Sequence, residues 1–253
     1  MANGIVPIPP PVNEIIRSYA PGSPEKASLK ARIRQMLGER IEMPLIIGGK
    51  EVRTGKTAEA VCPHDHRHVL GTYHLAGEAE VRMAIAAAAE AWRSWSETPW
   101  EHRAAVMLKA AELLAGPWRD TLNAACMLNQ SKNVFQAEID AACELIDFWR
   151  FNPHYLRFIY EQQPESMRGH WDYVEYRALE GFVFAVTPFN FASIAGNLPT
   201  APALMGNTVL WKPASSTVFT GWYLMKLMEA AGFPPGVINF IPGSGSKVGT
   251  PVM

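Results

Sequence analysis

The sequence predicts an α/β fold in which a parallel sheet is wound with helices. The main observation is the order of patterns near the C-terminus: an apolar strand over 181–186, a helical segment, a second apolar run over 208–211, a second helix and a third strand over 236–241. Strands that alternate with helices in this way form parallel sheets. Polar residues follow the first two strands directly, and α/β sheets bind ligands at the carboxyl ends of their strands.

The composition is that of a globular protein without a charge-driven partner. The 253 residues are 48% hydrophobic and 19% charged, enough for one large or two ordinary domains. A formal net charge of -1 gives no electrostatic reason to expect nucleic acid or an anionic membrane. No apolar run approaches the roughly 18 residues of a membrane span, and the N-terminus has the features of neither a signal nor a transit peptide. The expected compartment is the cytoplasm.

The three cysteines fit a reducing compartment. Cys62, Cys126 and Cys143 are odd in number and widely spaced, which is neither a disulfide framework nor a metal pattern. The histidines His64, His66, His68 and His74 could share one face of a strand, but no carboxylate or cysteine completes a recognisable spacing. We therefore expect no metal.

The N-terminal region is expected to lead from an extended segment into a helix. Residues 1–22 are proline-rich and should lie extended over a surface. Ser23-Pro24-Glu25 is a typical helix start, and Gly38 ends the apolar stripe that follows. Strands and turns are expected over 43–74, with Gly48-Gly49 as a hairpin turn.

Four helices should follow, over 78–95, over 101–115, up to about residue 130, and from about Asn133 until Pro153 interrupts or ends the last one. The last helix carries an apolar stripe formed by Phe135, Ile139, Ala142, Ile146 and Trp149. Its other side carries Asp140, Glu144 and Asp147 at spacings of four and three, a pattern that favours a solvated acidic face.

The stretch 171–179 alternates between apolar and polar residues and predicts a half-exposed strand outside the wound sheet. Such a strand is suited to an arm of an intersubunit sheet. The chain thus divides into an extended segment (1–22), a helical and edge-strand part (23–160), an oligomerisation strand region (161–180) and a βαβαβ unit (181–253).

Three features of the βαβαβ unit are candidates for chemistry. Asn190 follows the first strand, where its amide could donate to a developing oxyanion, although a helix N-cap is the commoner role. Lys212 ends the second strand, where it could bind ribose or phosphate oxygens or simply face solvent. Residues 215–217 could cap the helix that follows. The glycines Gly243, Gly245 and Gly249 depart by one residue from a dinucleotide fingerprint, so this turn alone is a weak signal.

Taken together, these motifs resemble those of the aldehyde dehydrogenase superfamily. The resemblance rests on Thr187-Pro188-Phe189-Asn190, on Lys212-Pro213 and on the run 230–239. The helix 136–152 is similar to that of the delta-1-pyrroline-5-carboxylate (L-glutamate gamma-semialdehyde) dehydrogenases within it. The resemblance runs from about residue 23 to the end. It implies a Rossmann-like cofactor domain, present here by its first half, and oxidation of the semialdehyde to glutamate with NAD in proline breakdown.

The resemblance also implies roles for single residues. Asn190 matches the oxyanion-stabilising asparagine, Glu144 a glutamate that faces the substrate amino group, and Phe191 an aromatic residue beside the substrate. The implied cofactor residues are Val186, Thr187, Pro188, Phe189, Lys212, Ser215 and Gly243. Many relatives carry a glutamate where this chain has Ser215, which leaves NAD and NADP both open.

The nucleophilic cysteine and general-base glutamate of the superfamily lie beyond residue 253, so the catalytic domain is expected to be absent and the chain inactive by itself. We expect it to be poorly soluble or partly molten alone, because an unpaired apolar edge strand is an aggregation site. Implied partners are an aldehyde substrate, further copies of the chain and a separate proline dehydrogenase, with no fused proline dehydrogenase domain ahead. Two alternatives stay open: another NAD(P)-dependent aldehyde dehydrogenase, such as a succinate-semialdehyde or betaine-aldehyde type, and a truncated non-catalytic paralogue that dimerises or binds nucleotide.

Overall fold

The computed structural model describes residues 7–253, and its centre is a five-stranded sheet in the order β3-β2-β8-β7-β6. The strands are β2 (Leu45–Ile47), β3 (Lys50–Val52), β6 (Phe182–Val186), β7 (Thr208–Lys212) and β8 (Ile238–Phe240). The last three run parallel, as predicted. β2 pairs antiparallel with β8, with Ile46 opposite Phe240, which no pattern in the sequence predicted.

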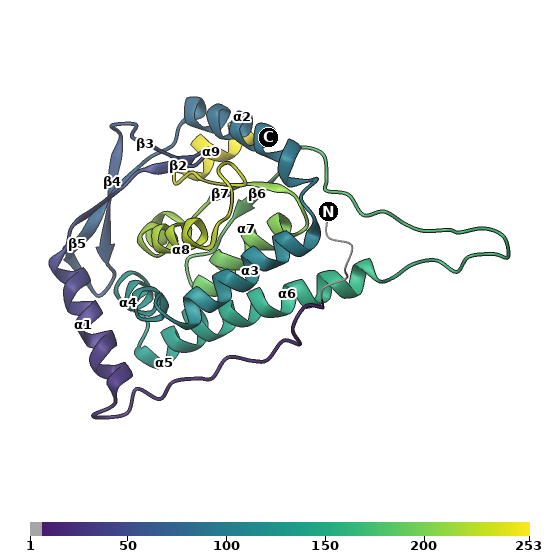
Figure 1. The fold of residues 1–253 in the computed structure, drawn as a ribbon. Coiled ribbons are helices and arrows are strands. Elements are labelled where there is room, and N and C mark those ends of the chain that lie inside the picture. Colours follow the sequence, from purple (N-terminus) through teal and green to yellow (C-terminus); the bar gives the residue numbers. More distant parts are fainter. Residues whose placement is uncertain (1–6) are drawn as a thin grey trace.

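Helices cover both faces of this sheet (Figure 1). Leu210 of β7 packs in a cluster with α2 (Glu78–Trp95) and α9 (Gly245–Val252). Its neighbours Val209 and Trp211 point to the other face, into the larger core with α7 (Ala192–Leu204) and α8 (Val218–Ala231). Beyond these lie α3 (Trp100–Ala115) and α4 (Arg119–Gln130), which confirms the predicted order of helices.

The N-terminal part behaves largely as predicted. Residues 7–20 form no helix or strand and run along the helical layer, beneath α6 in Figure 1. α1 (Pro24–Gly38) starts at Ser23, whose hydroxyl accepts from the N–H of Lys26 at 3.4 Å. Gly48 and Gly49 have φ of +58° and +73° and join β2 to β3, the geometry that a tight hairpin requires. A second sheet, in the order β1-β5-β4, consists of β1 (Ile41–Met43), β4 (Thr57–Cys62) and β5 (Asp65–His74).

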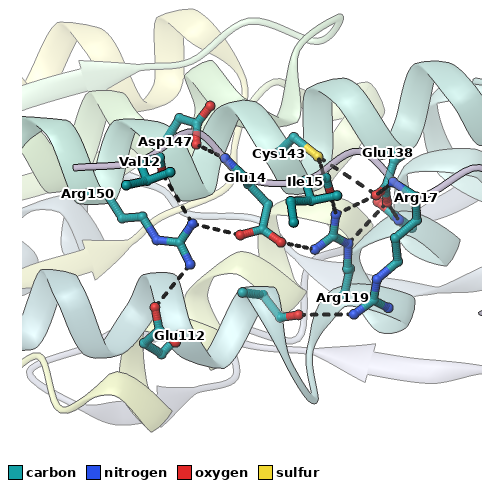
Figure 2. A network of polar contacts seen from close by, with 12 residues as sticks. Val12, Glu14, Ile15, Arg17, Glu112, Arg119, Glu138, Cys143, Asp147 and Arg150 are labelled. Atoms are coloured by element: carbon teal, nitrogen blue, oxygen red, sulfur yellow. Dashed lines mark hydrogen bonds and ion pairs between the residues drawn. The ribbon is translucent and has the colours of Figure 1, made fainter.

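The extended N-terminal segment is held by buried ionic contacts (Figure 2). Arg119 of α4 is 1% exposed and pairs with Glu138 and Glu14. Glu138 also accepts from the N–H of Arg17 and the hydroxyl of Tyr19, each at 2.8 Å. Burial alone would raise the pKa of Glu138, but the hydrogen bonds from Arg119, Arg17 and Tyr19 outweigh it and hold that pKa below its usual value.

The long helix differs from the prediction in two ways. It consists of α5 (Val134–Ala137), a π-helical segment η1 (Glu138–Glu144) and α6 (Leu145–Tyr160), so Pro153 lies inside it. The flanking residues Trp149 and Leu156 are buried, and this packing sustains the helix through the proline. The wider π turn rotates the side chains that precede it, and Phe135 is therefore 61% exposed although Trp149 is fully buried.

The predicted acidic face is wrong for Asp140. This residue lies in η1 and is only 3% exposed. An alternation of four and three residues assumes a uniform α-helix, and a π turn breaks that register. Glu144 and Asp147 are half-buried.

The strand predicted over 171–179 is not formed within the described chain, where residues 162–180 contain no strand, and its use in an intersubunit sheet stays a prediction. They form a long excursion away from the helices in Figure 1. The side chain of Gln163 joins the outgoing and the returning part of this excursion. It accepts from the backbone N–H of Val174 at 2.8 Å and donates to the carbonyl of Val174 at 3.2 Å. Trp171 and Tyr173 are 86% and 61% exposed. A β-ladder needs a partner strand, and the described chain offers none here.

β6 is an edge strand and not a buried one. Only Ala185 among its residues is buried, and Val186 is 51% exposed. No helix within residues 7–253 is long and apolar enough to cross a membrane.

Candidate functional site

The carboxyl ends of β6 and β7 lie side by side. Val186 is the register partner of Lys212, and the N–H of Thr187 donates to the carbonyl of Lys212 at 3.2 Å. The two groups of residues predicted for the site are therefore neighbours. This proximity follows from the parallel pairing, because parallel strands end at the same edge.

The residues at the carboxyl end of β6 comprise one buried anchor and three more exposed residues. Thr187 is 4% exposed, and its hydroxyl oxygen accepts from the indole N–H of Trp211 at 2.9 Å. Pro188 is half-buried, whereas Val186 and Phe189 are 51% and 65% exposed. Thr187 thus fixes the end of the strand, and the other three present a surface that a ligand could contact.

Asn190 is exposed and does not cap the helix. The capping position of α7 belongs to Phe191, which makes no side-chain cap, and the alternative role as N-cap is therefore wrong for Asn190. The first N–H groups of α7, those of Ala192 and Ser193, donate instead to the carboxylate of Asp140, each at 3.0 Å. A carboxylate at a helix N-terminus is stabilised by the free N–H groups and by the helix dipole.

Asp140 connects this helix start to a second charged residue. Its carboxylate also accepts from the Ser193 hydroxyl at 2.7 Å and pairs with the ammonium of Lys132. The same ammonium lies 4.6 Å from the centre of the Phe191 ring, a cation–π distance. The sequence had placed Asp140 in solvent, and it gave no signal for Lys132 or Ser193.

Glu144 joins the site through Ser193. The Ser193 hydroxyl lies 2.8 Å from Glu144 Oε2, besides its contact with Asp140. A hydroxyl has a single proton and donates to one acceptor at a time, so it cannot satisfy both carboxylates. Glu144 is only half-buried, and it is free to accept from a cationic group of a ligand. The structure thus gathers Asn190, Phe191 and Glu144 around the start of α7.

Lys212 is a buried cation and does not face solvent. Its exposure is 7%, and the contact of its ammonium within residues 7–253 is a hydrogen bond to the carbonyl of Pro213 at 3.1 Å. Burial lowers the pKa of this ammonium. An ammonium has three N–H donors, and two are left for ligand oxygens such as ribose hydroxyls.

The other predicted cofactor residues lie further along the same edge. Ser215 is exposed and opens a short 3₁₀ turn, η2 (Ser215–Thr217). This turn does not cap α8 with a side chain. Asn129 of α4 does so, by accepting from the N–H of Thr220 at 3.2 Å. Gly243 is buried, and a Cβ there would lie 2.6 Å from the Val248 side chain, so close packing explains this glycine.

None of the three cysteines has the surroundings of an activated nucleophile. All three are free and buried, and burial raises the pKa of the Cys126 and Cys143 thiols to about 12 and also raises that of Cys62. Only a thiolate attacks an aldehyde efficiently. Within residues 7–253, no three His, Cys, Asp or Glu side chains gather at a metal-binding distance.

Residues 51–253 match the model of the aldehyde dehydrogenase family. The chain is 49% identical over 243 residues to the delta-1-pyrroline-5-carboxylate dehydrogenase of Agaricus bisporus, covering 95% of this chain and 44% of that protein. It is 46% identical over 243 residues to the Dictyostelium discoideum protein of the same name, described as mitochondrial, covering 96% of this chain and 44% of that protein.

A solved structure has the same fold. The NAD-bound delta-pyrroline-5-carboxylate dehydrogenase of Mycobacterium tuberculosis matches with a TM-score of 0.97 and 50% identity, over 98% of this chain and 47% of that one. This match confirms the predicted fold class. The chain spans a little under half the length of the curated relatives it matches.

Proposed function

The chain belongs to the aldehyde dehydrogenase family, and on that premise we propose that it binds and orients an aldehyde and NAD for the oxidation of L-glutamate gamma-semialdehyde to glutamate. The whole protein, meaning the product of the complete gene, performs this reaction. The observation that carries the proposal is the convergence of Asn190, Phe191 and Glu144 beside the strand end that holds Lys212.

The substrate half of the site is the start of α7. The Asn190 amide donates to the aldehyde oxygen as negative charge develops on it, while the Phe191 ring packs beside the carbon chain. Glu144 accepts from the ammonium group of the substrate, and this pairing separates an amino-bearing semialdehyde from a plain aliphatic aldehyde. The carboxylates of Asp140 and Glu144 both contact the Ser193 hydroxyl, and this concentration of negative charge favours a cation at this position.

The cofactor half is the edge formed by β6 and β7. NAD bound there supplies the acceptor for the hydride that leaves the aldehyde carbon. With NAD bound, Lys212 would donate to the hydroxyls of the adenosine ribose with its free N–H groups, and Ser215 would assist from the turn that follows. Val186, Pro188 and Phe189 would contact the nicotinamide half, with the buried Thr187 fixing the strand end behind them, and Gly243 would be on the side of the phosphates. The residues present fit the cofactor, because a buried ammonium with one carbonyl partner has donors left over.

This chain orients the reactants but does not supply the attacking thiolate. The raised thiol pKa values of Cys126 and Cys143 support this assignment, and so does the burial of both side chains in helices. The nucleophile and the base that activates water are contributed from outside these 253 residues, so that the chain is inactive by itself. Copies of the chain associate through the excursion 162–180, whose exposed aromatic side chains favour a protein partner. A cytoplasmic location and association with a proline dehydrogenase complete the proposal.

The test of the oxyanion role is Asn190→Ala in the whole protein. We expect kcat to fall by about 10²–10³, the usual cost of removing one oxyanion donor. The matched control is Asn197→Ala, which removes a half-buried amide on the same helix that is bonded to Asn152 at 2.8 Å. If Asn190→Ala and the control have equal kcat values, Asn190 does not stabilise the oxyanion.

The test of the substrate is Glu144→Ala, assayed with glutamate semialdehyde and with a simple aliphatic aldehyde. KM should rise for the semialdehyde more than for the aliphatic aldehyde, because only the semialdehyde carries an ammonium group, and that group loses its partner when Glu144 is replaced. Equal changes for the two would favour another aldehyde as the substrate.

A further inference from the structure

Helix α7 depends on contacts from other helices for its position. It contains Pro199 and Pro202, which weaken an isolated helix, and Gly196, which packs so closely that an added Cβ would lie 2.7 Å from Leu145. At its C-terminal end the buried guanidinium of Arg103 donates to the carbonyl of Leu204 at 2.8 Å. At its N-terminal end Asp140 accepts the first two N–H groups.

The N-terminal contact is the one that bears on chemistry. Asn190 and Phe191 immediately precede the two residues whose N–H groups Asp140 accepts, so the carboxylate defines where this turn ends and the helix starts. Asp140 itself is 3% exposed and is held by Lys132 on one side. Lys132 in turn lies over the ring of Phe191, which constrains the side chain as well as the backbone.

Asp140 comes from the one segment of the long helix that is not an α-helix. Asp140 and Glu144 lie four residues apart in this segment, and both carboxylates contact the hydroxyl of Ser193. Single π turns inside helices are rare and are frequently found at functional sites. The segment thus presents two carboxylates to the start of α7: Asp140, which accepts its first N–H groups, and the half-buried Glu144.

We propose that Asp140 is a positioning residue that fixes the Asn190–Phe191 turn through the start of α7. The inference rests on the proposed function and deepens it. Asp140 touches neither the aldehyde nor the cofactor. It holds the oxyanion-binding amide in place, so that no binding energy is consumed in ordering the turn when the aldehyde arrives.

The experiment uses Asp140→Asn in the whole protein. An asparagine keeps the shape, but its NH₂ group faces a backbone N–H, and the charge that pairs with Lys132 is lost. We expect kcat per NAD-binding site to fall by about tenfold to hundredfold for both glutamate semialdehyde and an aliphatic aldehyde, with KM for NAD unchanged. The control is Asp147→Asn on the same helix, which removes a carboxylate that accepts from the N–H of Glu14 at 2.7 Å and should leave kcat unchanged.

A merely structural role is separated from positioning by the double variant. If Asp140 acts through Asn190, the variant Asp140→Asn/Asn190→Ala has the kcat of Asn190→Ala alone, within about twofold. If the two losses multiply, or if only the thermal midpoint falls while kcat per site is kept, Asp140 does not position the turn.

Should Asp140→Asn fail to fold, Ser193→Ala takes its place. It removes one of the three hydrogen bonds that Asp140 accepts from α7 residues and creates little change in volume. Assayed with the aliphatic aldehyde, which makes no use of Glu144, it should lower kcat by about two- to fivefold, the effect of a weakened single hydrogen bond. An unchanged kcat would overturn the inference. A wild-type protein that oxidises no aldehyde would instead overturn the proposed function.

Discussion

Two buried cations of this molecule have opposite surroundings. Arg119 is 1% exposed and is matched by the carboxylates of Glu138 and Glu14 and by the carbonyl of Ile15 (Figure 2). Lys212 is 7% exposed, and among the contacts of residues 7–253 its ammonium donates to the carbonyl of Pro213 alone. At Arg119 the contacts with the two carboxylates offset the free-energy cost of removing the charge from water. At Lys212 no carboxylate of the described chain offsets that cost.

The difference shows in the pKa values. Burial works against ionisation of both side chains, but the hydrogen bonds that Arg119 donates to the carboxylates of Glu138 and Glu14 reverse the effect and raise the pKa of Arg119. At Lys212 burial is unopposed and lowers the pKa. A buried charge that is paired with opposite charges of the same chain, as at Arg119, stabilises the fold. A buried charge without a counterion, as at Lys212, is typical of a ligand site.

The largest expected effect is at the structural cation. Arg119→Met in the whole protein should lower the free energy of unfolding by about 3–5 kcal/mol, because it leaves Glu138 buried without a counterion. Urea unfolding followed by tryptophan fluorescence measures it. The double variant Arg119→Met/Glu138→Leu should be less destabilised than the single one. A double variant that is worse than the single would contradict the account given for Arg119.

The second prediction concerns acid. Glu138 and Glu14 both have a pKa held below the usual value, through their bonds with Arg119 among others. A carboxylate with a lowered folded-state pKa contributes stability that is complete above its unfolded pKa, about 4.3, and is lost as the pH falls through the folded-state value. Unfolding midpoints in urea should therefore be constant between pH 7 and about pH 5 and should fall below about pH 4. Arg119→Met should show a shallower fall, and an equal fall in both proteins would assign the acid sensitivity elsewhere.

The smallest expected effect is at Lys212, and it should appear in binding and not in stability. Lys212→Met should weaken NAD binding by about tenfold, as expected for the loss of a charge-assisted hydrogen bond, when titrated calorimetrically. Its unfolding midpoint should stay equal to that of the wild type or rise, since an unmatched buried charge is removed. A large loss of stability with unchanged NAD affinity would make Lys212 a structural cation like Arg119 and would end the comparison.

Much of the fold could be predicted because its signals are local. The helix over Glu78–Trp95 agrees with its predicted bounds, and the glycine pair Gly48-Gly49 forms the predicted turn. The three parallel strands and the adjacency of their ends followed from the alternation of strands and helices. Each of these features is specified by periodicity or by a residue with a special backbone preference.

The details of the site were less accessible for a physical reason. Asp140 and Asp147 are the same residue type on one helix at a regular spacing, yet one is buried at a helix start and the other is half-buried beside the N-terminal segment. Residues of the π segment contact Arg119 of α4 and Ser193 of α7, which lie 19 and 53 positions away in the sequence. The caps of α7 and α8 likewise come from Asp140 and Asn129 on other helices, where local sequence suggested Asn190 and residues 215–217.

The sequence by itself determined the α/β class, the positions of most elements and the placing of Asn190 and Lys212 at two adjacent strand ends. Those properties depend on backbone propensity and on hydrophobic spacing, which neighbouring residues specify. Only the tertiary structure decided which charges are buried and what they contact: Asp140 at the start of α7, Arg119 between two glutamates, and Lys212 with donors left over. The contacts of Arg119 and Asp140 join residues that are 19, 53 and 105 positions apart, and no local pattern encodes such a meeting.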